Sequence, residues 1–353
     1  MTFTTPGLVC GHHHLYSSLA RGMPAPPAVS RSFIEVLENI WWRLDAALDL
    51  DMIYWSAALG AAEALLSGTT AIIDHHESPS AIDGSLDAIA AGCDLVGVRH
   101  ILSYGVTDRW SNGKMTSSVT PTTSMTDEAR RGLAENERYL KSGRPAMVGV
   151  HAAFTCGDET LEAASDLAKR YNTGVHIHVA EGPDDANAGQ RLSHLATDDW
   201  LLVHAVHLAE DLPGTIAHNP RSNMNNSVGY ANPAHRKNRI ILGTDGIGAD
   251  MLEEFRLAYV RHRESDLTAS PDPAWSWLHN GAHFFPDVVN DEVHWSYDES
   301  DSPWHVAFTP GIRATDVSIN GEALVANGIP LKFDLNEIRT KAAEAARRLH
   351  ERL

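Results

Sequence analysis

The stretch TPGLVCGHHHL, residues 5–15, decides the fold, because it is the first of eight short apolar or β-branched runs in the chain. Amphipathic stretches with apolar residues at three- and four-residue spacing lie between these runs, as in IEVLENIWWRLDAAL (34–48) and DETLEAASDLAKRY (158–171). This alternation is the signature of βα units and a parallel sheet. The other seven runs cover residues 69–76, 98–106, 146–154, 174–181, 200–208, 214–219 and 239–246.

Eight strands with intervening helices is the count of a (β/α)8 barrel, so the predicted fold class is α/β with a TIM-like barrel. An open, doubly wound sheet is the alternative. No G-x-G-x-x-G follows the first strand and no phosphate-binding loop occurs in the sequence, so nothing marks a nucleotide-binding crevice. We expect this barrel to cover residues 5–285.

The chain ends are expected to form a small β domain, with residues 286–353 supplying most of it and a C-terminal helix. Asn320-Gly321 between apolar runs is a strong hairpin signal. Asp334 is a candidate N-cap for the last helix, with Glu337 as its capping-box partner. Because only MTFTT precedes Pro6, this domain is expected to be reduced, and exposed strand edges would favour a homodimer or larger species.

The balance of charge excludes several classes of partner. The 353 residues include 28 Lys and Arg against 46 Asp and Glu, a net charge of −18, which leaves no basic face for a nucleic-acid backbone. The three cysteines lie far apart without a C-x-x-C pair, as in a reducing compartment. No secretory signal opens the chain, and the longest apolar tract, residues 52–66, is too short to span a bilayer. We therefore expect a cytoplasmic protein that binds neither nucleic acid nor membrane.

The 20 histidines are the unusual feature, and their placement suggests a metal site. His12 and His14 end the first strand, where the two-residue period puts both side chains on one face. A histidine or an acid recurs near the ends of later strands, as His178, His204 and Asp245. Three imidazoles and a carboxylate suit zinc or iron(II) with one position left for water, and barrel active sites lie at these strand ends.

Other polar residues near the strand ends are candidates for catalysis or substrate contact. Glu181 follows His178 by three residues, so it reaches the same site if the chain turns there, and a carboxyl group beside a metal suits proton transfer. His75, His76 and His151 end strands two and four and could contact substrate. Ordinary packing or a surface position is expected for the following residues: His13, His176, His194, His207, His262, His279, His350, Trp41 and Trp42.

The polar stretch SNGKMTSSVTPTTSM (111–125) follows the third strand. It would lie at the mouth of the barrel as a lid or, equally well, as an inert surface loop.

Taken together, these motifs resemble the amidohydrolase superfamily. PGLVCGHHHL is similar to its opening motif, and HVAEG, LLVHAVHL, HNPRSN and LGTDG resemble its later strand-end motifs in the same order. The combination resembles the cytosine deaminase and chlorohydrolase (ATZ/TRZ-like) branch. GTTAIIDHHESP, HNPRSNMNNSVG and GTDGIGADM look most like the aminohydrolases associated with selenium metabolism (SsnA).

The resemblance implies a metal-dependent amidohydrolase that acts on a non-peptide carbon–nitrogen bond. It implies His12, His14, His178 and Asp245 as metal ligands, and Glu181 and His204, with Asp245 again, as catalytic residues. The expected reaction is deamination at a C=N carbon of a small, heterocyclic molecule by a metal-activated water. Asp245 would be the base, Glu181 would protonate the substrate nitrogen, and His204 would stabilise developing charge.

Three alternatives use the same residues. The first two are dehalogenation and hydrolysis of a cyclic amide on the same scaffold. The third is a metal-binding or assembly protein without turnover, which predicts a missing acid or base, and neither is missing here.

One metal ion is expected rather than two. Binuclear members of the superfamily bridge their metals through a carboxylated Lys or a carboxylate at the end of strand four. AMVGVHAAF (146–154) has no Lys or acid, and His151 occupies the position that faces the pocket. Zinc is the expected ion and iron(II) the alternative.

Overall fold

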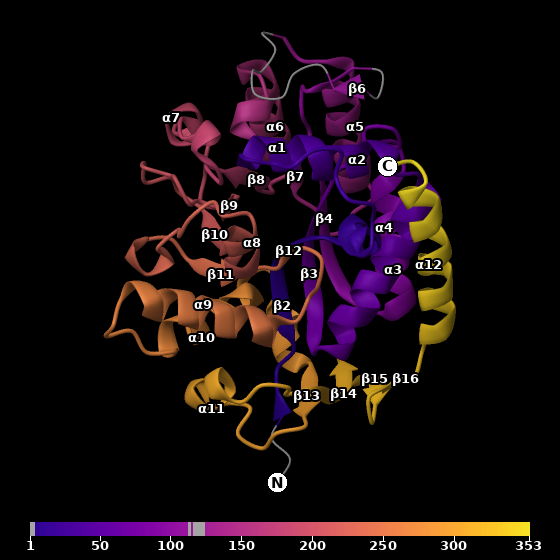
Figure 1. Ribbon diagram of the computed structural model, residues 1–353, viewed down its shortest axis with the longest axis vertical. Helices are drawn as coiled ribbons and strands as arrows, with labels where there is room; N and C mark the ends of the chain where they lie inside the picture. The colour runs from indigo at the N-terminus through magenta and orange to yellow at the C-terminus, as the bar shows by residue number, and fades with distance from the viewer. Residues whose placement is uncertain (1–3, 112–113, 116–123) are drawn as a thin grey trace.

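The computed structural model describes residues 4–111, 114–115 and 124–353 (Figure 1). Most of the Ser/Thr-rich stretch considered above as a lid lies outside these residues. Parallel strands and covering helices alternate along most of the chain, as the sequence predicts, although no helix separates the strands at 201–204 and 215–218. The parallel strands are β2 (Leu8–His14), β3 (Thr69–His76), β4 (Arg99–Tyr104), β7 (Val148–Ala152), β8 (Val175–Val179), β9 (Leu201–His204), β10 (Thr215–His218) and β11 (Ile240–Leu242).

Each of these strands pairs with the next one in sequence order. The junction between β4 and β7 consists of two isolated parallel bridges, Leu102 with Ala146 and Val106 with Val150. Beyond β11 the chain returns to β2, because the Thr244 N–H donates to the His12 carbonyl oxygen at 3.0 Å and β12 (Asp245–Gly246) pairs with β2. This order is that of the predicted (β/α)8 barrel.

Helices cover the outside of the strands. The 17-residue helix α3 begins at a capped end, where Asp49 accepts the Met52 N–H at 2.9 Å, and it packs closely on α4. Gly92 permits this close approach, since an added Cβ would lie 2.8 Å from the Tyr54 carbonyl oxygen. The α-helices are α1 (Phe33–Val36), α2 (Trp42–Ala47), α3 (Leu50–Leu66), α4 (Ser85–Val96), α5 (Asp127–Lys141), α6 (Asp158–Arg170), α7 (Ala188–Leu192), α8 (Pro220–Asn225), α9 (Met251–Ser265), α10 (Asp272–His279), α11 (Pro303–Phe308) and α12 (Leu335–His350).

A separate antiparallel sheet joins the two ends of the chain. Its order is β1 (Thr4–Thr5), β13 (Glu292–Trp295), β14 (Ala314–Ile319), β15 (Glu322–Ala326) and β16 (Ile329–Pro330). The predicted hairpin joins β14 to β15, with Asn320 and Gly321 both at positive φ. Figure 1 shows this sheet at the bottom of the view, near the start of β2, and α12 beside α3.

The C-terminal helix α12 begins as predicted. The Asp334 carboxylate accepts the backbone N–H groups of Asn336 and Glu337. The buried residues of α12, Ile338, Ala342, Ala345 and Leu349, recur at three- and four-residue spacing, which gives the helix one core-facing side.

The inside of the barrel is divided into an apolar layer and a polar layer. Phe285 and Val288 close the apolar layer, whose members are Val9, Ala71, Ile73, Met147, Leu201, Val203, Ala217 and Ile241. The histidines and acids of the strand ends lie above it. Within the described residues, no helix has the length and apolar character needed to cross a membrane.

Candidate active site

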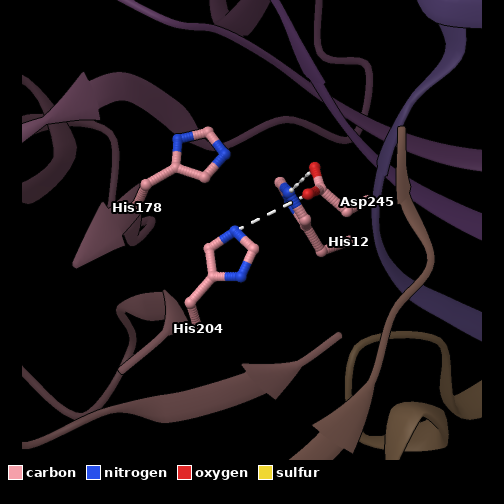
Figure 2. Close-up of side chains that lie close together, drawn as sticks. All are labelled: His12, His178, His204 and Asp245. Atoms are coloured by element: carbon pink, nitrogen blue, oxygen red, sulfur yellow. Dashed lines mark ion pairs between the residues drawn. The ribbon is translucent and has the colours of Figure 1, made fainter. Parts of the chain in front are cut away.

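Four side chains from different strands converge at the carboxyl ends of the barrel strands. Figure 2 shows His12 from β2, His178 from β8, His204 from β9 and Asp245 from β12 facing one another. Each offers one ligand atom, and these atoms all lie within 4.8 Å of one another. A second group with the same property contains His14, His75 and His178.

Three distances among the four predicted metal ligands are close to those that one small ion requires. His14 Nε2 lies 3.0 Å from Asp245 Oδ1 and 3.2 Å from His178 Nε2, and His12 Nε2 lies 3.4 Å from Asp245 Oδ1. Ligand atoms bound about 2.1 Å from a tetrahedral zinc ion lie roughly 3.4 Å apart. The structure therefore brings together His12, His14, His178 and Asp245 as a donor set that fits a divalent metal.

The tautomers of two of these histidines also fit metal binding. His14 Nδ1 donates to the His75 carbonyl oxygen and His178 Nδ1 donates to the His151 carbonyl oxygen, both at 2.6 Å. A carbonyl oxygen can only accept, so when each ring is neutral, as metal binding requires, its lone pair lies on Nε2, toward the centre of the site. Nε2 of His12 is buried and has no hydrogen-bond partner among the described residues, as expected of an atom reserved for a metal.

Backbone and side-chain contacts hold Asp245 in place. The backbone of Asp245 has a positive φ of 58°, and its carbonyl oxygen lies 2.7 Å from His13 Nδ1. Its side-chain Oδ2 accepts a short hydrogen bond from the Ser222 hydroxyl. Burial alone would raise the pKa of Asp245. In the metal-free chain, the His12 and His14 side chains beside it outweigh burial and hold that pKa well below its usual range. The carboxyl group is therefore ionised.

The pKa of Glu181 is shifted in the opposite direction to that of Asp245. Burial, and then the charge of Asp245, raise its pKa well above the usual value. Glu181 Oε2 lies 3.3 Å from His204 Nε2, and His204 Nδ1 lies 2.7 Å from Asn223 Oδ1. With its Nδ1–H donated to Asn223, His204 can accept the proton of a neutral Glu181 at Nε2.

The chain turns between His178 and Glu181, as their three-residue separation requires. Ala180 has a positive φ of 48°, and its N–H donates to Asp185 Oδ2 at 2.7 Å. Asp185 thus stabilises the turn that brings Glu181 to the site.

A cavity of about 220 Å³ opens on these groups. His14, His178, Glu181 and Asp245 form one part of its wall. Aromatic and apolar side chains form another part: Phe33, Leu37, Trp41, Trp42 and Phe154. Trp42 is buried, as expected, yet both Trp41 and Trp42 also face the cavity, so their role extends beyond core packing.

The three predicted substrate contacts are placed differently. His151 lines the cavity, with Nε2 3.9 Å from Glu77 Oε2. His75 is buried behind the wall, where its Nε2 donates to the Val150 carbonyl oxygen at 3.0 Å. His76 bonds the Ser78 hydroxyl at 2.8 Å and packs against two tyrosine rings. The structure therefore brings only His151 of the three to the described cavity wall.

A buried polar cluster that sequence reasoning missed completes the cavity. Arg109 donates to Glu77, stacks 4.3 Å from the centre of the Trp42 ring, and lies 3.6 Å from Asp45 Oδ2. Asp45 Oδ1 is buried and has no hydrogen-bond partner within the described parts of the chain. One signal was present in the sequence: Asp45 lies four residues after Trp41 and eight after Leu37, on the apolar side of the predicted helix.

Known proteins share both the sequence pattern and the fold. The model of the amidohydrolase family matches residues 3–279. The 5'-deoxyadenosine deaminase of Methanocaldococcus jannaschii is 26% identical over 392 residues, which cover 96% of this chain and 87% of that protein. The 5-methylthioadenosine/S-adenosylhomocysteine deaminase of Syntrophomonas wolfei is 28% identical over 393 residues, with 98% and 86% covered.

Two solved structures have the same fold. A triazine hydrolase variant superposes with a TM-score of 0.80 at 21% identity, covering 97% of this chain and 87% of that one. An adenosine deaminase from Xanthomonas campestris with bound zinc also gives a TM-score of 0.80 at 21% identity, with 99% and 86% covered. These likenesses confirm the predicted barrel.

Proposed function

Because this chain belongs to the amidohydrolase family, we propose that it is a metal-dependent aminohydrolase that deaminates a small nitrogenous heterocycle. One observation carries the proposal: a neutral acid, Glu181, and an ionised base, Asp245, face the same cavity beside the convergent imidazoles. Deamination needs both, since one group removes a proton from water and the other protonates the substrate nitrogen. The curated relatives described above are themselves named deaminases.

We assign the metal to His12, His14, His178 and Asp245, and we expect one ion per chain, zinc before iron(II). A bound divalent ion would lower the pKa of a water molecule toward neutrality. A single ion is favoured because β7 presents His151 at the cavity, where a second ion would need a Lys or an acid as a bridge.

Three side chains have separate roles in the proposed reaction. Asp245 accepts a proton from the attacking water, with Ser222 donating to its Oδ2 atom and holding its orientation. Glu181 donates its proton to the substrate nitrogen. His204, held by Asn223, lies 3.8 Å from Asp245 Oδ2 and 3.3 Å from Glu181; once protonated at Nε2 as well, it would donate a hydrogen bond to the group under attack and stabilise developing charge.

The charge of the cavity restricts the substrate. Its lining includes one arginine, Arg221, and five acids, of which Asp245 is ionised while burial raises the pKa of Asp45, Glu181 and Asp185. That arginine is committed to Glu254 and to backbone carbonyl oxygens, including those of Thr244 and Gly246. Asp45 Oδ1 is available to accept a hydrogen bond from a hydroxyl or amino group. We therefore propose a neutral or cationic substrate with an aromatic ring and a donor group, and a nucleoside without phosphate meets this description.

Ammonia release by the zinc-loaded protein tests the proposal. The substrate panel contains 5'-deoxyadenosine, adenosine, adenosine monophosphate, free purines and pyrimidines, aminotriazines, guanidines and formimino compounds, with a chlorotriazine for chloride release. We expect ammonia from one or more neutral members and none from the monophosphate. Chloride release without ammonia would replace deamination by dehalogenation. Ring opening without ammonia would favour amide hydrolysis, and zinc binding without any turnover would favour a metal-binding or assembly role.

We also propose that the protein works in the cytoplasm as a homodimer. Cys10, Cys93 and Cys156 are buried thiols, which suits a reducing compartment. Trp304 and Phe308 on α11 stack on each other yet remain 51% and 66% exposed, which is unusual for large aromatic side chains on a monomer. Light scattering coupled to sizing should give twice the chain mass, and a monomer at micromolar concentration would contradict the dimer.

A further inference from the structure

His12 differs from the other proposed histidine ligands in the partner of its Nδ1 atom. The Nδ1 atoms of His14 and His178 donate to backbone carbonyl oxygens, whereas His12 Nδ1 lies 2.9 Å from Nε2 of His176. His176 is fully buried in β8, two residues before His178, so both rings project from the same side of that strand. The orientation of His12 therefore depends on another side chain.

The hydrogen bonds continue from His176 to the backbone of β3. His176 Nδ1 lies 3.1 Å from the Ser103 hydroxyl, which donates to the Asp74 carbonyl oxygen at 3.0 Å. Because Ser103 has one proton and gives it to a carbonyl oxygen, it accepts from His176 Nδ1–H. Nε2 of the neutral His176 ring is then an acceptor and takes the Nδ1 proton of His12. The lone pair of His12 is left on Nε2.

Burial disfavours the opposite direction of donation. If Ser103 donated to His176, the proton of His12 would move to Nε2. That atom faces Asp245 Oδ1 at 3.4 Å but makes no hydrogen bond to any described residue, so its N–H would be poorly satisfied. A proton on Nε2 would also prevent His12 from binding a metal.

We propose that His176, supported by Ser103, is a positioning residue that fixes His12 in the tautomer needed to bind the metal. The inference rests on the metal site proposed above. It gives a role to a histidine that sequence reasoning assigned to packing. Loss of the outer hydrogen bond of a metal-binding histidine typically weakens metal affinity by about 10- to 100-fold.

The test is the zinc affinity of the full chain, measured by competition with a chelator, for the parent and three variants. His176→Leu removes the acceptor for His12 Nδ1–H, while His176→Gln restores one through its amide oxygen. His218→Leu is the matched control, because His218 is equally buried and neither of its ring nitrogens has a partner among the described residues. Circular dichroism reports whether each variant is folded.

We expect His176→Leu to weaken zinc binding by about 10- to 100-fold, with the Gln variant and the His218→Leu control close to the parent. A folded Leu variant with parental affinity, or equal losses in the Leu and Gln variants, would overturn the inference and leave the proposed function intact. Absence of zinc binding by the parent would overturn the metal site itself. If His176→Leu does not fold, Ser103→Ala decides, and parental zinc affinity in that variant would overturn the inference.

Discussion

Glu181 and Asp245 share one cavity but hold opposite charge states. Burial and the neighbouring charge of Asp245 raise the pKa of Glu181, so it keeps its proton to higher pH than a solvent-exposed glutamic acid does, whereas His12 and His14 keep Asp245 ionised despite its burial. A general acid and a general base can therefore operate at the same pH.

Replacement of Glu181 by Gln should lower turnover at least about a hundredfold without changing the zinc content. Because a general acid must carry its proton, kcat/KM of the parent should fall as pH rises through the raised pKa of Glu181, and the Gln variant should lack this decline. Measurement of kcat/KM between pH 5 and pH 10 checks both points. The exposed Glu162→Gln on α6 is the control, and near-parental turnover in Glu181→Gln would remove Glu181 from the mechanism.

Asp245→Asn should abolish activity more completely than Glu181→Gln. The substitution weakens metal binding and also removes the proposed base, whereas the Glu181 substitution affects proton donation alone. Zinc analysis and turnover of the two purified variants check this order. Retention of both zinc and rate in Asp245→Asn would show that the proposed ligand set is wrong.

The raised pKa of Asp74 should make the stability of the protein depend on pH. Its buried Oδ1 accepts the Leu15 N–H at 2.6 Å, and burial raises its pKa to about 7, against about 3.9 in an unfolded chain. The folded state binds the proton of Asp74 more tightly than the unfolded chain does. The contribution of the protonated Asp74 to the free energy of unfolding is therefore fully present below the pKa of the unfolded chain and is lost as pH rises through about 7. Asp74→Asn keeps an acceptor for Leu15 but does not titrate. Its Tm relative to the parent should therefore increase from pH 5 to pH 8 in metal-free protein, and parallel Tm profiles would contradict this account.

At the scale of elements, the segment over residues 33–47 shapes the cavity. The sequence predicts one helix over 34–48, but the structure interrupts it between α1 and α2 with a π-helical segment, Leu37–Trp41. A π segment widens the helical turn and is frequent at functional sites. Here it coincides with the position where two consecutive tryptophans, Trp41 and Trp42, both reach the cavity wall.

The two tryptophans should respond differently to replacement by Ala. Trp42 is buried beneath the Arg109 guanidinium, so Trp42→Ala should lower the free energy of unfolding by about 3–5 kcal/mol. Trp41 is only partly buried, so Trp41→Ala should cost less stability and mainly raise KM. Urea unfolding and steady-state kinetics separate these effects. Equal losses of stability would show that Trp41 is a core residue rather than a cavity wall.

At the scale of the whole molecule, the strands and the central histidines were predictable because short stretches of sequence determine both. Each strand is a short apolar run, and the period of two places His12 and His14 on one face. The contact between His12 and His176 was not predictable, because these residues are 164 positions apart and meet only when the barrel sets the register of β2 against β8. Asp45 and Glu77 were missed for a similar reason, since loops and covering helices position them.

The central claim is that one metal ion at this cluster supports hydrolytic deamination. The most direct measurement is ammonia release by metal-free protein as zinc is added in steps, with the best neutral member of the substrate panel. Our account predicts that the rate rises in proportion to added zinc and saturates at about one equivalent per chain. With each rate normalised to its own maximum, the parent and His151→Ala should give the same saturation point. Saturation at two equivalents in the parent and one in His151→Ala would show a second ion bound by His151, and absence of ammonia at every zinc concentration would contradict deamination.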